Sequence, residues 1–196
     1  MHNQHTLKSM RGLTLIELLV GLTIMGIISA IAIPSFSEAI RRHQISTHTG
    51  QIYHLLVFAR SQAVSYNQPV TLCPSQGTMN CLRSRDWSHK NLLVFIDNNH
   101  NGTRDNQEQI VRVFDTGQEG SRLLWRSFGN KSYLTFMPIG LTDYQSGNIT
   151  YCHSGLDRAE AKILVMNIAG RPYYGQDSNG DAIAENGSSD NLQCSL

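Results

Sequence analysis

Charge is scarce in this 196-residue chain, which has 16% charged residues and a formal net charge of +1. A balance this close to zero gives no global electrostatic reason to expect a polyanionic partner. The scarcity is uneven: residues 1–12 contain no acidic residue, residues 18–36 no charged residue at all, and residues 175–196 no Lys or Arg. These gaps mark off a basic N-terminal segment, an uncharged run and an acidic tail.

The motifs of common catalytic sites are also missing. The sequence contains no nucleophile elbow, no P-loop, no paired zinc motif and no internal repeat. His43, His48 and His54 stand five and six residues apart, so they do not share one face of a helix as metal ligands would. We therefore expect no enzymatic activity, no catalytic residue and no cofactor, apart from the calcium considered below.

The four cysteines form neither a C-x-x-C pair nor a spacing typical of metal sites. An even number behind an export-like N-terminal segment favours two disulfides in an oxidising compartment. Of the three pairings that four cysteines allow, we favour Cys73 with Cys81, which closes a short loop, and Cys152 with Cys194, which attaches the C-terminal tail to the fold. The alternative is four reduced thiols in a cytosolic protein.

The uncharged run of residues 18–36 is dense in Leu, Ile, Val and Met. Its nineteen residues are about the length needed to cross the hydrocarbon core of a bilayer. A secretory signal peptide has a shorter apolar region followed by a small-residue cleavage site. The stretch "SAIAIPSF" offers an imperfect site of that kind, so ordinary secretion stays an alternative. However, Gly12 precedes the apolar run, which is the wrong order for such a signal.

A helix is predicted to continue beyond Pro34, which we expect to kink it. An apolar stripe at steps of seven, four, three and four residues makes this second half amphipathic and suited to packing on a sheet. The helix should run from residue 13 to about residue 66, on the order of 80 Å at 1.5 Å per residue, before Pro69 stops it. The stripe consists of Ile45, Ile52, Leu56, Ala59 and Ala63.

Beyond the helix the chain is strand-like. Seven short β-branched or aromatic runs are separated by Gly, Asn and Asp, with no second helical pattern. They predict an α+β fold in which a pair of antiparallel sheets packs on one long helix, and residues 175–196 form an irregular surface segment held by Cys194. The runs are "PVTLC", "NLLVFID", "QIVRVFD", "RLLWRSF", "YLTFMPI", "NITYC" and "KILVMNI".

The stretch "RGLTLIELL" resembles a class III prepilin signal, with a short basic leader that ends at Gly12 and Glu17 as the fifth residue after it. This is a resemblance to the type IV pilins and pseudopilins, in which a membrane aspartyl peptidase cleaves after the glycine and methylates the new N-terminus. It implies cleavage between Gly12 and Leu13 and N-methylation of Leu13. Leu13 stands at the position where these signals usually have Phe. Removing residues 1–12 would leave 14 basic and 15 acidic residues.

The resemblance also suggests a role for Glu17. A single carboxylate near the end of a membrane helix is costly to bury and usually has a partner. The amine of Leu13 on a neighbouring subunit would be that partner, and the pair would form only when subunits stack in the correct axial register. The alternative is a Glu17 at the interface, hydrated among lipid headgroups.

Three later stretches, "SQAVSYNQPVTLCPSQGTMNC", "DWSHKNLLVFIDNNHNGTRDNQEQIVRVF" and "ILVMNIAGRPYYG", resemble the GspH/FimT group of minor pilins and pseudopilins. The resemblance implies a pilin-like architecture. Residues 1–12 would be a cleaved leader, residues 13–36 a transmembrane and filament-core helix, residues 37–66 its amphipathic continuation, and residues 67–196 a periplasmic β-rich head.

The function implied is that of a minor pilin that helps to initiate or cap a type IV pilus. The alternative is the equivalent subunit of a type II secretion pseudopilus, which serves protein export. The implied partners are the prepilin peptidase, other minor pilins, the major pilin and an inner-membrane assembly platform. The implied location is the bacterial inner membrane, with one membrane pass and a periplasmic head.

Residues 97–108, "DNNHNGTRDNQE", fit the calcium-loop pattern D-x-[DN]-x-[DN]-G-x5-E at every specified position. Both flanks, however, are strand-like, and Asn, Asp and Gly are also what a plain hairpin loop needs. Calcium binding and a structural loop are therefore both open. The calcium ligands would be Asp97, Asn99, Asn101, Asp105 (through water) and Glu108, with Gly102 at the turn.

A third functional hypothesis is DNA binding. The segment from Gly170 to Tyr173 lies where some FimT-like proteins carry a G-R-x-R motif for DNA uptake. Here Tyr173 replaces the second Arg, and the tail that follows is acidic. Phosphate binding relies on clustered cations, and only Arg171, with Lys162 upstream, is available at this place.

Overall fold

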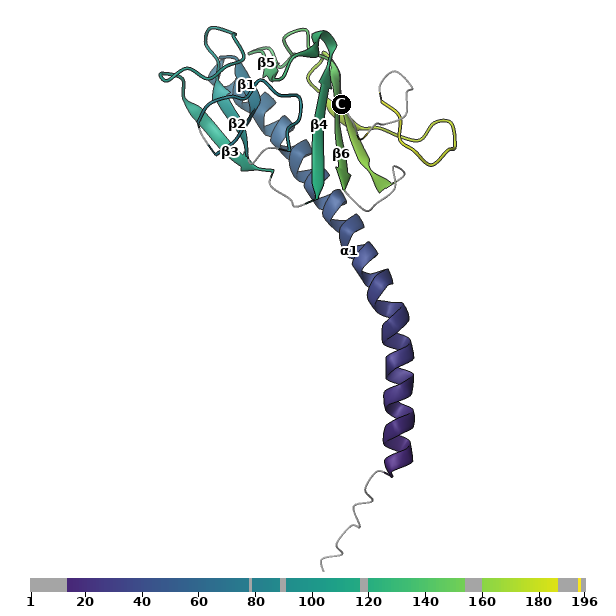
Figure 1. Cartoon of the computed structure of the whole chain (residues 1–196). Coiled ribbons are helices and arrows are strands. Elements are labelled where there is room, and N and C mark those ends of the chain that lie inside the picture. The colour runs from purple at the N-terminus through teal and green to yellow at the C-terminus, as the bar shows by residue number, and fades with distance from the viewer. Residues whose placement is uncertain are drawn as a thin grey trace, which may run out of the picture. The chain divides into compact units, whose positions relative to one another are not determined.

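The structure is a computed structural model of the whole chain (Figure 1). It describes residues 14–77, 79–88, 91–116, 120–153, 160–186 and 194, without the side chains of residues 34 and 35. The chain divides into two compact units, Met1–Arg41 and Arg42–Leu196, and we call the second unit the head. The helix α1 (Leu15–Tyr66) contributes to both units.

The predicted long helix is observed as α1, without interruption at Pro34. The bend predicted at Pro34 stays a prediction. The helix ends in a Schellman motif: the backbone N–H of Asn67 donates to the Val64 carbonyl and that of Gln68 to the Ala63 carbonyl, both at 3.3 Å. Asn67 is in the left-handed region at φ 52°, which asparagine tolerates. The helix therefore stops two residues before Pro69.

The head contains two four-stranded antiparallel sheets. The first has the order β3-β2-β1-β5 and the second the order β4-β6-β7-β8. The seven predicted runs correspond to the first seven strands. The strands are β1 (Val70–Ser75), β2 (Asn91–Ile96), β3 (Ile110–Asp115), β4 (Ser121–Ser127), β5 (Leu134–Phe136), β6 (Gly147–His153), β7 (Lys162–Met166) and β8 (Pro172–Tyr174), with a 3-10 turn, η1 (Phe128–Asn130), after β4.

Strand β8 is the one that the sequence analysis missed. It is only three residues long and begins with Pro172, and a proline inside a run normally argues against a strand. Its place explains why proline is tolerated, because β8 pairs with β7 alone and forms an edge of the second sheet. An edge strand has one side without ladder hydrogen bonds, so a missing N–H costs little there.

The core lies where the head part of α1 meets both sheets. In Figure 1, β1 to β3 lie to the left of this part of the helix and β4 and β6 to the right. All five residues of the predicted stripe are buried. Leu55 and Thr49 are buried as well, because a helix that contacts two sheets buries a wider face than a single stripe. Trp87 and Trp125 stack near the centre, with ring centroids 5.3 Å apart.

Two disulfides are present, Cys73–Cys81 and Cys152–Cys194, which is the pairing that the sequence favours. The first ties β1 to the loop that follows it. The second ties the C-terminal tail to β6. Ile183 and Cys194 also pack on a small cluster formed by Cys152, Ala161 and Ile163, so apolar contacts as well as the disulfide hold the tail.

Candidate functional site

The most unusual surface of the chain is the first half of α1. Its large apolar side chains are all exposed, and an 18-residue window has a mean hydropathy of 2.3 with none of it buried. An apolar surface of this extent marks a membrane or protein contact. By length and composition the helix suffices to cross a membrane. The exposed residues are Leu15, Ile16, Leu18, Leu19, Val20, Leu22, Ile24, Met25, Ile27, Ile28, Ile31, Ile33 and Phe36.

A capping box starts this helix. The backbone N–H and the hydroxyl of Thr14 both donate to Glu17 Oε2 at 2.9 Å, and the N–H of Glu17 donates to Thr14 Oγ1 at 3.4 Å. The two side chains thus satisfy donors that the first helical turn leaves without partners. The sequence analysis missed this role of Glu17, although the signal is the spacing T-x-x-E in "TLIE". Gly12 and Leu13, the predicted cleavage site, lie outside the described residues.

The predicted calcium loop joins β2 to β3 and is centred on Asp97. This residue is fully buried. Its Oδ1 accepts the N–H of Asn101 at 3.1 Å, and its Oδ2 accepts the N–H of Gly102 at 2.9 Å and the hydroxyl of Thr71 at 2.8 Å. The Thr71 hydroxyl also lies 2.7 Å from that of Thr135 on β5. Asp97 therefore fixes the loop to the first sheet.

The other end of this loop is closed by Glu108, which is also buried. Its Oε1 accepts the N–H of Asn98 and its Oε2 that of Asp105, both at 2.9 Å. Asp105 Oδ2 in turn accepts the side-chain amides of Asn99 and Asn101. Donors within the loop thus reach all three carboxylates, which favours the structural-loop interpretation. Calcium binding by this loop stays a prediction.

The conformation of this loop requires glycine at position 102. Gly102 has φ 70°, and a Cβ placed on it would lie 2.2 Å from the ring of Tyr133. Both the left-handed backbone and the close approach of Tyr133 therefore require glycine at this position. Gly102 also donates its N–H to Asp97, so the turn, the buried carboxylate and the aromatic ring hold one another in place.

The two cations considered for DNA binding do not come together. Arg171 precedes β8, which pairs with the end of β7 at Met166. Lys162 begins β7 and is exposed. The two cations therefore lie toward opposite ends of a five-residue strand, on the order of 13 Å at 3.3 Å per residue. Lys162 therefore does not join Arg171, whereas the Arg60 guanidinium lies beside the neighbouring Gly170. DNA binding at Arg171 stays a prediction.

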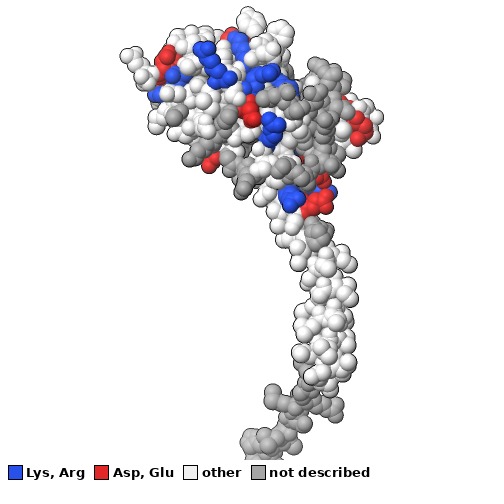
Figure 2. All heavy atoms as spheres, viewed as in Figure 1, with Lys and Arg blue, Asp and Glu red and all other residues white. Residues whose placement is uncertain are grey.

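A group of cations that the sequence analysis missed lies elsewhere on the head. Arg83, Arg85 and Lys131 line a pocket of about 440 Å³ beside the Cys73–Cys81 disulfide. The Arg85 guanidinium donates to Asn130 Oδ1 at 2.9 Å. Figure 2 shows Lys and Arg side chains gathered on this face of the head. No sequence rule would join these cations, because Lys131 is more than forty residues from the two arginines.

Arg126 adds a fourth positive charge near this group. Its burial, and to a lesser extent the positive charge of Arg85, lower the pKa of its guanidinium. The guanidinium donates to Thr150 Oγ1 at 3.2 Å. The influence of Arg85 on Arg126 indicates that the two guanidinium groups are close enough to interact. Arg126 therefore adds to the positive charge near Arg85, even though the chain as a whole is nearly neutral.

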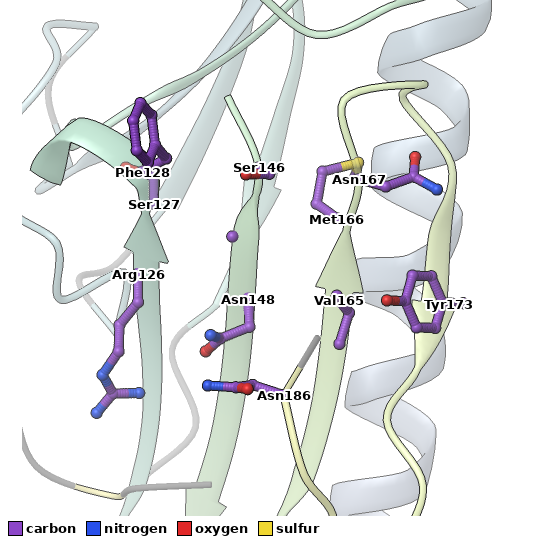
Figure 3. A pocket seen from close by; sticks show the side chains of 11 residues that line it. Arg126, Ser127, Phe128, Ser146, Asn148, Val165, Met166, Asn167, Tyr173 and Asn186 are labelled. Atoms are coloured by element: carbon purple, nitrogen blue, oxygen red, sulfur yellow. The ribbon is translucent and has the colours of Figure 1, made fainter. Parts of the chain in front are cut away.

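A second pocket, of about 490 Å³, lies on the second sheet (Figure 3). In this view the ribbon of α1 lies behind the strands, so the pocket is on the outer face of the sheet. Arg126 is its only charged side chain, and Asn148, Asn186 and Tyr173 supply most of the remaining polarity. Among the described residues that line it there is no carboxylate, histidine or cysteine.

Models of known protein families match both the head and the N-terminal segment of the chain. The family model described as type II transport protein GspH matches residues 48–170, and the prokaryotic N-terminal methylation motif matches residues 7–33. No curated protein matches the sequence closely enough to count as a relative.

Solved structures with a similar fold include the type IV minor pilin FimU of Pseudomonas aeruginosa in two crystal forms. The P21 form has a TM-score of 0.54 at 19% identity and covers 69% of this chain and 91% of that chain. The P65 form has a TM-score of 0.51 at 19% identity, with 67% and 92% covered. The shared fold is an α+β, pilin-like one. Since the GspH model spans more than half of the chain, this protein belongs to the GspH family and carries the prokaryotic N-terminal methylation motif at its start.

Proposed function

We propose that this protein is a minor pilin of a type IV pilus, a non-enzymatic subunit that helps to initiate or cap the filament. The observation that carries the proposal is the exposed apolar half of α1 directly behind a methylation motif. A soluble protein would have to hide such a surface. A subunit that moves from a membrane into the core of a filament uses it in both places.

Before assembly, residues 13–36 would cross the bacterial inner membrane once and the head would lie in the periplasm. The prepilin peptidase would cleave between Gly12 and Leu13 and methylate Leu13. Two disulfides suit an oxidising compartment such as the periplasm. After extraction by the inner-membrane assembly platform, the same apolar helix would pack against those of the major pilin and of other minor pilins.

Glu17 would set the axial register of that packing by pairing with the Leu13 amine of a neighbour. The capping box is compatible with this role, because both hydrogen bonds from Thr14 end on Oε2 and hold the carboxylate at the first turn. A carboxylate that is positioned in advance loses less side-chain freedom when it binds an amine. Cleavage after Gly12 would leave Thr14 in the chain, so the box would persist in the mature subunit.

The alternative within the same class is a subunit of a type II secretion pseudopilus. The description of the matching family model favours it, whereas the fold of FimU favours the pilus. The leader, the helix and Glu17 would work in the same way in both machines. The two differ in what a strain without the protein loses: surface pilin in one case and secreted proteins in the other.

The experiment is therefore to measure the major pilin sheared from the surface of a strain that lacks the gene. We expect a steep loss, restored by the wild-type gene and not by Glu17→Ala. Glu17→Gln is the informative variant, because glutamine also completes a capping box but carries no charge. Failure of Glu17→Gln assigns the role to the charge, whereas full restoration would limit Glu17 to capping. Unchanged surface pilin with reduced exoproteins in the culture supernatant would favour the pseudopilus.

DNA binding is a second candidate function, and the cations around Arg85 are a stronger candidate for it than Arg171 with Lys162. Retardation of duplex DNA by the full-length protein in detergent should weaken steeply with salt, because bound cations release counterions. Lys131→Glu and Arg83→Glu should each weaken it, and Arg171→Ala should leave it unchanged. Binding that is absent at low salt, or that depends on Arg171 alone, would exclude this site.

A further inference from the structure

The segment that follows β8 brings three carboxylates together. One carboxylate oxygen from each of Asp177, Asp181 and Glu185 lies within 4.8 Å of the others. Among the described residues, this is the only group of three or more His, Cys, Asp or Glu side chains with that geometry. Acidic side chains also gather at the right of the head in Figure 2, where Figure 1 shows the yellow loop of the tail. We propose that these three residues bind a calcium ion.

The decisive member is Glu185, because it is buried. Only 4% of its surface is exposed. Its Oε2 accepts the N–H of Ser178 at 2.7 Å, whereas its Oε1, also buried, meets no hydrogen-bond donor in the described part of the chain. Buried polar atoms nearly always have a partner. A carboxylate oxygen that is buried beside two other carboxylates and meets no donor calls for a cation.

The loop is built to hold Glu185 there. Gly175 donates its N–H to the Ile163 carbonyl at 3.0 Å, and Glu185 donates its own to the Gln176 carbonyl at 3.1 Å, which closes the base of the loop. A Cβ on Gly175 would lie 2.4 Å from the Glu185 carbonyl oxygen, so the two strands of the loop touch there. The backbone of Glu185 is thus fixed against Gly175 and Gln176, and its buried side chain points to Ser178 of the loop rather than into solvent.

Hydrogen bonds within the loop orient the carboxylates of the two aspartates and leave lone pairs on them for a metal ion. Asp177 accepts the N–H groups of Gly180 and Ala182 at 2.7 and 2.8 Å. Asp181 accepts the N–H of Ile183 on Oδ1 at 2.8 Å and the side-chain amide of Asn179 on Oδ2 at 3.3 Å. An ionised carboxylate offers about four lone-pair sites, so these bonds leave both aspartates able to bind a cation. The hydrogen bonds fold the loop and orient the carboxylates.

The ligand chemistry selects calcium. All three donors are carboxylates, with no imidazole or thiolate, which disfavours zinc and copper. Calcium takes six to eight oxygen ligands in flexible geometries, and carboxylates, loop carbonyls and water supply such a set. Magnesium demands a near-ideal octahedron, keeps several waters and usually binds through one or two carboxylates, whereas three gather here. No Lys or Arg follows Arg171 to neutralise the cluster from within the tail.

Among the described residues, the hairpin loop that fits the calcium pattern in sequence has no buried carboxylate oxygen without a donor like Glu185 Oε1. Asp97 and Glu108 each have hydrogen-bond donors on both carboxylate oxygens. Among the described residues, the loop does not bring Asp97, Asp105 and Glu108 into a group of the kind formed in the tail. The calcium-loop sequence pattern thus occurs in the hairpin loop, whereas the group of three close carboxylates occurs in the tail.

Bound calcium would stiffen one border of the outer face of the second sheet. Glu185 and Ser178 line a pocket of about 550 Å³ together with Tyr173 and Tyr174, and the neighbouring Asn186 also lines the pocket of Figure 3. By fixing residues 176–186, the ion would fix one wall of both pockets. The shape of this face of the head would then depend on calcium.

The test is calorimetric titration of CaCl2 into the full-length protein in detergent after treatment with a chelator. We expect one ion per chain with a Kd of about 10⁻⁴ to 10⁻³ M, the range of extracellular calcium modules. Glu185→Gln, which keeps the bond from Ser178, and Asp181→Asn should each weaken binding about tenfold or more. Asp105→Asn, in the hairpin loop, should leave it unchanged.

Thermal unfolding separates calcium binding from a structural role. CaCl2 at about ten times the Kd should raise the Tm of the wild type by about 3–6 °C and leave that of Glu185→Gln unchanged. The proposal fails if the wild type binds no calcium at about 10 mM, or if Asp105→Asn removes the binding and Glu185→Gln does not. It also fails if Glu185→Gln lowers the Tm but keeps the calcium-dependent rise.

Discussion

The two halves of α1 belong to one helix and meet opposite surroundings. Up to Phe36 the apolar side chains cover every side of the helix and are exposed. From Ile45 onward they form a face that is buried against two sheets, with polar residues on the other sides. A helix that is apolar all round needs lipid or other helices, whereas an amphipathic one needs a single packed interface. The distribution of apolar residues, rather than their number, decides which half belongs to the head.

The two halves of α1 should also respond differently to amino-acid substitutions. In the second half, each buried Leu or Ile contributes roughly 1.5–3 kcal/mol to the stability of the head. In the first half, the same side chains are exposed, so they add no packing energy to the head, and in the proposed function they would attach it to the membrane or the filament. Stability and assembly should therefore respond to different sets of substitutions along one helix.

The largest expected effect on folding comes from the second half. Leu56 is buried in the core, so Leu56→Ala should lower the free energy of unfolding of the head by about 2–5 kcal/mol through lost transfer energy and a cavity. Leu22→Ala, at an exposed position of the first half, should leave it unchanged. Thermal unfolding of both full-length proteins in detergent measures the difference. Equal losses would mean that the two halves are not distinct in their packing.

A comparable effect on insertion should come from the first half. Ile24→Lys places a charge in the middle of the apolar segment and should disfavour membrane insertion by about 2.5–3.5 kcal/mol. Val64→Lys, on an exposed side of the second half, is the matched control and should behave as wild type. Fractionation of cells followed by alkaline extraction of membranes shows whether each variant is integral. An integral Ile24→Lys protein would contradict a transmembrane role for residues 13–36.

A smaller effect is expected in the head at Gly102. Gly102→Ala would force a Cβ into the ring of Tyr133 and strain a left-handed backbone, and should cost about 1–3 kcal/mol. Gly129 has a similar φ of 73°, but no atom lies within 4 Å of the Cβ that Gly129→Ala would add. This variant therefore measures the cost of the strained backbone alone. Denaturant unfolding of both proteins gives the comparison. Equal destabilisation would remove the Tyr133 contact from the explanation.

The smallest effect should come from the capping box. Thr14→Ala removes the two hydrogen bonds of the Thr14 hydroxyl, to Glu17 Oε2 and from the Glu17 N–H, and should cost about 0.5–2 kcal/mol in the first turn, while the Glu17 charge remains. Surface pilin in a complemented strain should therefore fall less with Thr14→Ala than with Glu17→Gln. A larger loss of surface pilin with Thr14→Ala would mean that capping of the helix contributes more to assembly than the Glu17 charge does. The two halves of α1 would then differ less in function than we infer.

Much of the fold follows from local patterns. The apolar stripe predicts the buried face of α1, and the β-branched runs predict β1 to β7, because periodicity and burial are directly linked in both cases. Leu55 was missed because one stripe describes contact with one surface and α1 contacts two. The edge strand β8 was missed because three residues starting with Pro172 carry too weak a signal.

The candidate sites were less predictable, since they depend on contacts between distant residues. Arg85 and Lys131 meet only because the loop after β1 lies beside η1, which no local pattern specifies. The carboxylates of the tail were visible in the sequence, but their meaning depends on the burial of Glu185. The capping box at Thr14 was within reach of sequence reasoning, because T-x-x-E before an apolar run is a known signal.

The most direct test of the central claim is the N-terminal sequence and mass of this chain in filaments sheared from wild-type cells. We predict that the chain is present there at low copy number, begins at Leu13 and carries one methyl group on its N-terminal amine. Detection of the full-length chain in the membrane fraction alone, still beginning at residue 1 and absent from every filament preparation, would contradict the account.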